Sequence, residues 1–442
     1  MKELLFDVAV IGGGAAGMAA ALELDARGFS CAIIEREDFL GGILMQCIHN
    51  GFGLHEFSEE LTGPEFAERF IERVRDSKIA VFLNTTVTRI DADNASPSLG
   101  GAASLGSTPS LGSAPPSPPA YRRLSCVSPG GVMIMQCRAV VLAMGCRERN
   151  RGNVRIPGSR PAGVFTAGLA QRLANIEGYI PGKEIVIIGS GDIGLIMARR
   201  MSWLGCNVKA VIEIMPYPAG LTRNIVQCLN DFNIPLHLSC QTTNIFGNDR
   251  VEGVEVTPME NGAPVPAKRF RIDCDTVLLS VGLVPENELS RAAGVELSGA
   301  TGGPLVDSNL MTSLDGVFAC GNVLHVHDLA DWVAEESRRT GAHVAQWLGG
   351  ARPAAQVRAK AGSNVRYVNP ARIDPTRDNK VYLRSLVVKN EAVLELRMGQ
   401  RVVRSVKKNH VQPSEMISVS VGPKDFQDGA AREDGALEFS IV

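Results

Sequence analysis

Residues 6–37 read FDVAVIGGGAAGMAAALELDARGFSCAIIERE, and this stretch decides the fold. Its apolar run, glycine cluster, alanine-rich segment and second apolar run predict a strand, a tight turn, a helix and a parallel strand. Gly12, Gly14 and Gly17 form G-x-G-x-x-G, where the glycines permit the turn, let the backbone approach a pyrophosphate, and let the helix pack closely on the strand. Glu35 ends the second strand, where a carboxylate can hold a ribose diol. The stretch therefore predicts a dinucleotide-binding unit.

The same pattern recurs at residues 182–213, GKEIVIIGSGDIGLIMARRMSWLGCNVKAVIE. Gly189, Gly191 and Gly194 follow a predicted strand, and Glu213 ends the next one. Two nucleotide sites in one chain are explained most simply by FAD at the first and a nicotinamide nucleotide at the second. The residues expected to contact them are Gly12, Gly14, Ala15, Ala16, Gly17, Glu35 and Arg36 at the first site, and Gly189, Gly191, Asp192, Ile193, Gly194 and Glu213 at the second.

Glu213 bears on the identity of the second nucleotide. A carboxylate at this position bonds the ribose 2′-hydroxyl and repels a 2′-phosphate, so NAD(H) is favoured over NADP(H). Two alternatives stay open: Glu213 is an ordinary solvated acid at a strand end, or Arg223, ten residues on, reaches a phosphate.

The composition is that of a globular enzyme. The chain has 442 residues, 45% hydrophobic and 21% charged, with a formal net charge of −2, which is enough for two or three domains and gives no sign of a nucleic-acid partner. No segment reaches about 18 uninterrupted apolar residues, so no membrane span is expected. The ten cysteines are scattered without C-x-x-C or zinc-ligand spacing, which favours reduced thiols and a cytoplasmic location.

Three further segments carry a family resemblance: AVVLAMGCRERN (139–150), DTVLLSVGLVPENEL (275–289) and TSLDGVFACGNV (312–323). Together with the two glycine turns, they make the chain resemble, over about residues 5–350, the two-dinucleotide-domain flavoproteins related to the pyridine nucleotide–disulfide oxidoreductases. The resemblance implies that the first and third segments contact FAD and that the second leaves the nicotinamide domain. The site residues so implied are Gly145, Gly282, Gly321 and Asn322, with Asn322 standing where the family has an aspartate that bonds the ribityl chain.

The resemblance implies an α/β fold with two Rossmann-like, three-layer ββα domains, the NAD domain being inserted in the FAD domain. A small β-rich domain is expected at the C-terminus, because short segments of alternating apolar residues follow residue 363. The expected domains are 1–157 (FAD, first part), 158–285 (NAD(P)), 286–350 (FAD, second part) and 351–442 (linker and β-rich domain).

A narrower resemblance rests on residues 41–57, 213–236 and 320–333. These segments are similar to small FAD/NAD oxidoreductases that accompany glycerol-3-phosphate dehydrogenase-like flavoproteins, and to flavin subunits of opine-type and related amine or amino-acid dehydrogenases. This resemblance implies an oligomeric assembly that holds a small cysteine-rich subunit besides a partner flavoprotein dehydrogenase subunit.

Residues 41–57, GGILMQCIHNGFGLHEF, carry the candidate catalytic residues Cys47 and His49. In the broader family a C-x-x-x-x-C pair follows the glycine doublet, and those two positions here are Leu44 and His49, so disulfide reduction is not expected. Gly42, of the doublet, joins the cofactor-binding set.

Cys47 has three interpretations: an inert small hydrophobe, a single redox cysteine that would make the protein an NADH oxidase or peroxidase, or a polar contact to flavin or substrate. His49 is either a proton donor or acceptor near the flavin or a hydrogen-bonded loop residue.

Other segments give local expectations. Thr62, Pro64 and Glu65 predict a capped helix over 62–77. Residues 93–119, rich in Pro, Gly and Ser, predict a disordered insertion. His325, His327, Asp328 and Asp331 follow the last FAD segment; their spacing matches no common zinc pattern, so hydrogen-bonded loop residues and no metal are expected.

Overall fold

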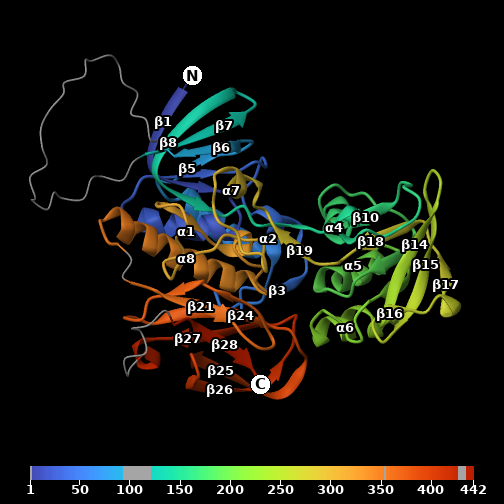
Figure 1. Cartoon of the computed structure of the whole chain (residues 1–442). Helices are drawn as coiled ribbons and strands as arrows, with labels where there is room; N and C mark the ends of the chain where they lie inside the picture. Colours follow the sequence, from blue (N-terminus) through green and yellow to red (C-terminus); the bar gives the residue numbers. More distant parts are fainter. Residues whose placement is uncertain (1, 93–120, 353–354, 427–434) are drawn as a thin grey trace, which may run out of the picture.

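The computed structural model describes residues 2–92, 121–352, 355–426 and 435–442. The predicted disordered insertion, 93–119, lies outside the described residues. Figure 1 shows the described chain as a first α/β unit, a second α/β unit beside it and a C-terminal β unit. In the described part of the chain, no helix is both long and apolar enough to cross a bilayer.

The first unit is built on a seven-stranded sheet. Strands β5, β2, β1 and β8 run parallel in that spatial order, and β20 continues the parallel set beside the second half of β8. The first half of β8 pairs with the antiparallel strand β7, and β7 pairs in turn with the antiparallel strand β6. The bounds are β1 Lys2–Ile11, β2 Cys31–Ile34, β5 Ala80–Phe82, β6 Thr86–Ala92, β7 Arg122–Ser128, β8 Gly131–Leu142 and β20 Val317–Ala319.

The alternation of side chains along β1 explains the three layers. Val8 and Val10 point to one face, where α1 (Ala15–Ala26), α2 (Gly63–Arg75) and α8 (Ala330–Leu348) cover the sheet. Ala9 and Ile11 point to the other face, where they meet the core of the β6–β7–β8 meander.

The sequence missed β7 but predicted α2 well: Thr62 and Glu65 form the expected capping box, with the Thr62 N–H donating to Glu65 Oε2 at 2.8 Å.

The second unit repeats the plan with a five-stranded parallel sheet in the order β10-β18-β11-β12-β13. Helices α4, α5 and α6 cover one face, and an antiparallel sheet of β14 to β17 covers the other. The helices are α4 Ala167–Asn175, α5 Asp192–Trp203 and α6 Thr222–Cys228. The strands are β10 Val164–Thr166, β11 Glu184–Ile188, β12 Asn207–Ile212, β13 Leu236–His237, β14 Cys240–Gly247, β15 Val251–Glu260, β16 Ala263–Pro264, β17 Phe270–Asp273 and β18 Thr276–Leu279.

The chain passes between the two units twice, and the two passages pair with each other. Strand β9 (Cys146–Glu148) on the way out is antiparallel to β19 (Leu283–Pro285) on the way back. Two matching hydrogen bonds close this ribbon, from the Arg149 N–H to the Gly282 oxygen and from the Glu286 N–H to the Gly145 oxygen, both 3.0 Å. The second unit is therefore inserted in the first and held by a two-stranded connection.

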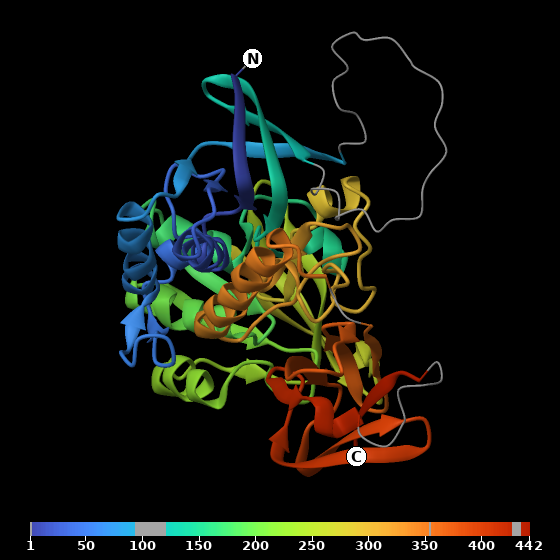
Figure 2. The same cartoon turned by 90° about the vertical axis from the view of Figure 1, so that its left-hand side faces the viewer.

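The C-terminal unit is a β-sandwich with its own apolar core. Figures 1 and 2 both place it below α8, so α8 lies between this unit and the sheet of the first unit. The predicted strands following residue 363 are confirmed as β22, β24, β25 and β26, and four others were not foreseen. The bounds are β21 Val357–Ala361, β22 Val365–Asn369, β23 Arg372–Ile373, β24 Asn379–Ser385, β25 Lys389–Met398, β26 Arg401–Val411, β27 Met416–Val421 and β28 Leu437–Ile441.

The predicted fold class is thus confirmed, while the domain limits stay a prediction. The remaining elements are short. They are η1 Gly42–Gln46, β3 Asn50–Phe52, β4 Leu61–Thr62, α3 Arg151–Val154, η2 Asn230–Phe232, η3 Pro266–Lys268, α7 Glu288–Ala292, η4 Gly321–Val323 and η5 Pro423–Phe426.

Candidate functional site

The first glycine turn is closed by protein on two sides and open on the third. A Cβ at Gly12, whose φ is +107°, would lie 2.4 Å from the oxygen of Ala143, and one at Gly17 would lie 1.8 Å from the Gly12 oxygen. At Gly14 no heavy atom lies within 4 Å of the Cβ position. Gly14 is the N-cap of α1, and Ala15 begins that helix, so the open side faces unpaired N–H groups that attract an anion.

Glu35 is tied to this turn. Its Oε2 accepts the N–H of Gly13 at 2.6 Å, and its Oε1 accepts the N–H of Glu37 at 2.9 Å. The carboxylate is buried and therefore fixed beside the turn. Arg36 points to the surface, with its Nε 3.9 Å from Glu37 Oε1.

Three other segments meet the first turn. A Cβ at Gly42 would lie 3.3 Å from Gly14 Cα, and one at Gly321, where φ is +71°, would lie 2.8 Å from Ala16 Cβ. The segment after β8 also meets the turn, through Ala143 beside Gly12, and no heavy atom lies within 4 Å of the Cβ position of Gly145, two residues further on. The cofactor-binding residues predicted from segments far apart in the sequence therefore surround one open cradle, which fits a long, anionic dinucleotide such as FAD.

The second glycine turn repeats the geometry. A Cβ at Gly189 (φ +92°) would lie 2.1 Å from the oxygen of Ser280, and the Gly194 N–H donates to Ser280 Oγ at 2.9 Å. Gly191 is the N-cap of α5, which begins with Asp192 and Ile193. The turn is compatible with a second nucleotide. Gly282 follows β18 with φ +97° and open space at its Cβ position.

Glu213 is bound to the second turn as Glu35 is to the first. Its Oε2 accepts both the N–H and the hydroxyl of Ser190, at 2.9 and 2.6 Å, and its Oε1 accepts the N–H of Met215 at 2.9 Å. Arg223 reaches towards the first unit, where its Nη2 is 3.2 Å from the Cβ position of Gly51.

The two units meet at a polar contact, here called the domain junction: Gln46, Cys47, Gly168, Gln171 and Asn175. The side-chain amide of Gln46 donates to the backbone oxygen of Gly168 at 2.8 Å and to Gln171 Oε1 at 3.1 Å. The side-chain amide of Asn175 donates to the backbone oxygen of Gln46 at 2.9 Å. Gln46 and Gln171 are buried. Because buried amides are costly to leave unpaired, the junction holds α4 against η1.

Cys47 belongs to the domain junction. Its Sγ donates to the Ile43 oxygen at 3.3 Å and lies 3.7 Å from Gln171 Oε1, with 5% of the residue exposed. Burial raises the pKa of Cys47 to about 12, so the thiol stays protonated at neutral pH. None of the ten cysteines forms a disulfide. A redox role requires a thiolate, so the geometry favours packing and hydrogen bonding for Cys47.

His49 lies in the loop after Cys47, facing the second unit. Its Nδ1 is 3.0 Å from the Asn50 oxygen, and its ring is 5.2 Å from that of Phe52. Burial lowers the pKa of His49, and the guanidinium groups of Arg199 and Arg223 lower it further. A neutral imidazole between the units is chemically able to donate or accept a proton, so both interpretations of His49 remain.

The histidines after the last FAD segment form a buried cluster with a residue that the sequence did not indicate. His325 Nε2 and His327 Nε2 each lie 3.1 Å from a carboxylate oxygen of Glu336, and all three side chains are fully buried. Their ligand atoms lie within 4.8 Å of one another, as in a metal site. Asp331 lies apart and accepts three backbone N–H groups from residues 53–56 at 3.0–3.2 Å.

Sequence reasoning missed Gln46, Gln171 and Glu336. Only Glu336 had a usable signal: with Val333 and Thr340 it follows the helical period of the buried face of α8, where a charged residue is unusual. Gln46 and Gln171 lie in segments whose contact depends on how two domains pack, which no local pattern reports.

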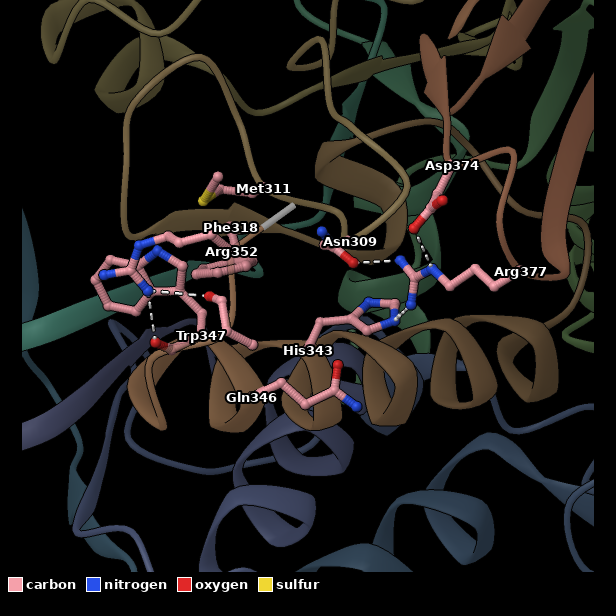
Figure 3. Close-up of a pocket in the computed structure, with 10 residues that line it drawn as sticks. Asn309, Met311, Phe318, His343, Gln346, Trp347, Arg352, Asp374 and Arg377 are labelled. Carbon is pink, nitrogen blue, oxygen red and sulfur yellow. Dashed lines mark hydrogen bonds and ion pairs between the residues drawn. The ribbon is translucent and has the colours of Figure 1, made fainter. Parts of the chain in front are cut away.

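A separate cavity of about 180 Å³ lies between α8 and the C-terminal unit (Figure 3). Arg377, one of the two arginines that line it, is engaged by its neighbours: Nη1 lies 3.3 Å from His343 Nε2, Nε lies 3.2 Å from Asp374, and the group also bonds Asn309. These contacts join α8 to the C-terminal unit across the cavity, while Nδ1 of His343 stays buried without a hydrogen-bond partner among the described residues.

Comparison with known proteins agrees with this architecture. The chain is 25% identical over 340 residues to an opine oxidase subunit of Rhizobium meliloti, covering 72% of this chain and 58% of that protein. It is 26% identical over 368 residues to the small chain of glutamate synthase [NADPH] of Mycobacterium tuberculosis, covering 78% and 67%. The chain spans about half to three fifths of the length of the first relatives it matches.

Among solved structures, thioredoxin reductase of T. acidophilum superposes with a TM-score of 0.59 at 23% identity, covering 77% of this chain and 98% of that one. A likeness at this identity shows the shared fold. The model of the family described as pyridine nucleotide-disulphide oxidoreductase matches residues 6–349. The chain therefore belongs to the pyridine nucleotide-disulphide oxidoreductase family.

Proposed function

We propose that this chain transfers hydride between NAD(H) and FAD as the electron-transfer subunit of a dehydrogenase complex. When bound, FAD supplies a ring that exchanges a hydride with the nicotinamide. The protein's part is to bind and orient: each glycine turn holds one pyrophosphate, and the domain junction fixes the two units relative to each other.

The observation that carries the proposal is a pair of equivalent nucleotide turns whose domains meet without a thiol couple. Disulfide exchange requires an attacking thiolate and a second sulfur within bonding reach. At the junction Cys47 is a buried, protonated thiol, and Leu44 and His49 stand at the positions of the family's cysteine pair. Electrons that reach the flavin therefore leave by a route other than a disulfide.

NAD(H) is the proposed nucleotide. Glu213 offers a buried carboxylate, held by Ser190, where the adenosine ribose of the second nucleotide would lie. Residues 214–222, which follow it, contain neither lysine nor arginine. A 2′-phosphate would meet the negative charge of Glu213, which disfavours NADP(H).

The proposed partner is a second flavoprotein subunit that oxidises glycerol 3-phosphate or an amine or amino acid, together with a small cysteine-rich subunit. Two relatives are named as parts of assemblies, one as a subunit of an opine oxidase and the other as the small chain of a glutamate synthase, which favours an amine or amino-acid substrate. We also propose that the protein is cytoplasmic and that it works within an oligomeric assembly.

Anaerobic titration of the purified yellow protein with NADH, and separately with NADPH, tests the core of the proposal. NADH is expected to bleach the flavin stoichiometrically, and NADPH to need a much higher concentration. Absence of bleaching by either nucleotide would favour a non-catalytic, flavin-bearing assembly subunit. Isolation of the complex from its native cell, followed by identification of its members, tests the partner.

The other alternative, a stand-alone NADH oxidase or peroxidase that uses Cys47, predicts that Cys47→Ser abolishes peroxide-dependent NADH consumption. The buried thiol gives this alternative no structural support.

A further inference from the structure

Glu336, in the middle of α8, is a carboxylate with no exposed surface. Its Oε1 accepts the backbone N–H of Gly321 at 2.8 Å and the Nε2–H of His327 at 3.1 Å, and its Oε2 accepts the Nε2–H of His325 at 3.1 Å. An isolated buried charge is very costly, so these three donors are what keeps Glu336 in place. Together the four residues are called the Glu336 cluster.

The pKa values of His325 and Glu336 are both lowered in this cluster. Burial lowers the pKa of His325 to about 4, and the neighbouring His327 adds to the effect, so the imidazole of His325 is neutral at neutral pH. Burial by itself would raise the pKa of Glu336, but the two imidazoles that bond it hold that pKa well below its usual range. The cluster is thus one buried carboxylate that accepts N–H groups from the neutral imidazole of His325, from His327 and from the Gly321 backbone.

The cluster reaches the expected flavin site through two neighbouring residues. The Gly321 N–H donates directly to Glu336. The backbone N–H of His327 donates to Asn322 Oδ1 at 3.0 Å. Only the oxygen of an amide can accept an N–H, so this bond fixes which way the Asn322 amide faces. Its NH₂ group lies on the opposite side and donates to the sulfur of Cys146, the residue after Gly145, at 3.6 Å, which leaves its second N–H for another acceptor.

We propose that Glu336 is a positioning residue for the flavin: it fixes Gly321 and, through His327, presents the Asn322 amide as a hydrogen-bond donor to a hydroxyl of the ribityl chain. An aspartate at position 322 would accept from that hydroxyl, whereas this asparagine donates to it. The inference rests on the proposed function, because it takes Gly321 and Asn322 to face FAD.

The C-terminal unit completes the cluster. The Tyr367 hydroxyl lies 3.4 Å from His325 Nδ1, and the Tyr382 ring lies 5.2 Å from that of His325. Arg384 donates to the Val326 oxygen at 3.0 Å. The C-terminal unit therefore excludes water from the Glu336 cluster and contributes to positioning the flavin.

The test measures the affinity of the apo-protein for FAD, with the quenching of flavin fluorescence as the signal. Glu336→Gln places an NH₂ group against an imidazole N–H and leaves a buried donor unpaired, so FAD is expected to bind about tenfold more weakly, with a shifted visible spectrum. Glu335→Gln, one position earlier on the same helix and bonded to Lys380 in a partly exposed pair, is the matched control and is expected to bind within about twofold of wild type.

A double variant tests the route through Asn322. Asn322→Ala is expected to weaken FAD binding by about tenfold, and Glu336→Gln combined with Asn322→Ala by about the same amount, because both act on one interaction. Multiplication of the two effects to about a hundredfold would overturn this route.

His327 offers a pair of variants that does not depend on the folding of Glu336→Gln. The amide of His327→Gln can still donate to Glu336 and should keep FAD binding within about threefold, whereas His327→Ala should weaken it by about tenfold. Both variants keep the backbone N–H that bonds Asn322. A metal at this cluster predicts loss in both variants and a stoichiometric metal in dialysed wild-type protein, and either result overturns the hydrogen-bonded cluster.

The two levels of inference fail differently. Wild-type apo-protein that does not bind FAD would refute the proposed function itself. Wild-type protein that binds FAD, alongside a folded Glu336→Gln that binds it equally and with the same spectrum, would refute only the positioning role.

Discussion

Glu35 and Glu213 make the same contact in two different units of the chain. Each carboxylate accepts the backbone N–H of the residue between the first two glycines of its own turn, Gly13 at 2.6 Å and Ser190 at 2.9 Å. The second copy adds the Ser190 hydroxyl, which donates to Glu213 at 2.6 Å and accepts the Ala219 N–H at 2.8 Å. In both copies the acid proposed to bind a ribose also stiffens the turn proposed to bind a pyrophosphate.

This equivalence gives a prediction for nucleotide choice. Glu213→Gln keeps an acceptor for the Ser190 N–H but removes the negative charge, so the preference for NADH over NADPH in kcat/KM is expected to fall by about tenfold. Steady-state reduction of a dye acceptor with each nucleotide measures the ratio. Glu35→Gln, in the other turn, is the control and should leave that ratio unchanged in the fraction that retains flavin. An unaltered ratio in Glu213→Gln would show that Glu213 does not select the nucleotide.

The domain junction predicts a separation of binding from hydride transfer. Gln171→Ala removes the acceptor for Gln46 without touching either glycine turn, so NADH should bind with an unchanged Kd while the limiting rate of flavin reduction falls by about tenfold. Rapid mixing of NADH with the oxidised protein at a series of concentrations yields both quantities. Gln227→Ala, an exposed glutamine on α6, serves as the control. A change in Kd alone would contradict a docking role for the junction.

Cys47 should behave as a protonated, buried thiol. Because its pKa is raised to about 12, alkylation of the folded protein at pH 7 to 9 is expected to spare Cys47, and Cys47→Ser is expected to retain flavin reduction by NADH within about twofold. Mass spectrometry of iodoacetamide-treated protein locates the modified cysteines. Rapid labelling of Cys47 in the folded state would restore the thiol mechanism.

His325 should make the folded protein sensitive to acid. Its pKa is lowered to about 4 in the folded state from 6.5, so the folded form resists a proton that the unfolded chain takes up. The contribution of His325 to stability is therefore fully present above pH 6.5 and is lost as the pH falls towards 4, at about 1.4 kcal/mol per pH unit. Urea unfolding of apo-protein at pH 7 and pH 5 should show a smaller difference for His325→Gln than for wild type; equal differences would be evidence against this assignment.

The sequence predicted the parts of the fold that depend on local pattern. The two glycine turns, the strands that precede them and the acids that follow them were all readable because each physical requirement falls within one βαβ unit. The capping box at Thr62 was readable for the same reason. The roles of the predicted site residues remain predictions, although the structure brings Gly14, Gly42 and Gly321 around one cradle.

What the sequence could not predict depends on contacts between distant segments. Gln46 and Gln171 are ordinary residues in their own helices and become important only where η1 meets α4. Glu336 lies next to another glutamate, and only its place on the buried face distinguishes it. The aspartates after the last FAD segment pointed to a possible group with His325 and His327, but the carboxylate that the histidines contact comes from a full turn deeper into α8.

The paired strands β9 and β19 constrain how the nucleotide units can move. Gly145 and Gly282 enter the two strands with positive φ values, +71° and +97°, and both have free space around them. A short hydrogen-bonded ribbon resists stretching, so we expect relative motion of the two units to be rotation about the ribbon rather than separation along it. A rotation about the ribbon displaces each atom in proportion to its distance from the ribbon. The gap between the two units would therefore widen least next to β9 and β19 and most at the parts of the units farthest from them.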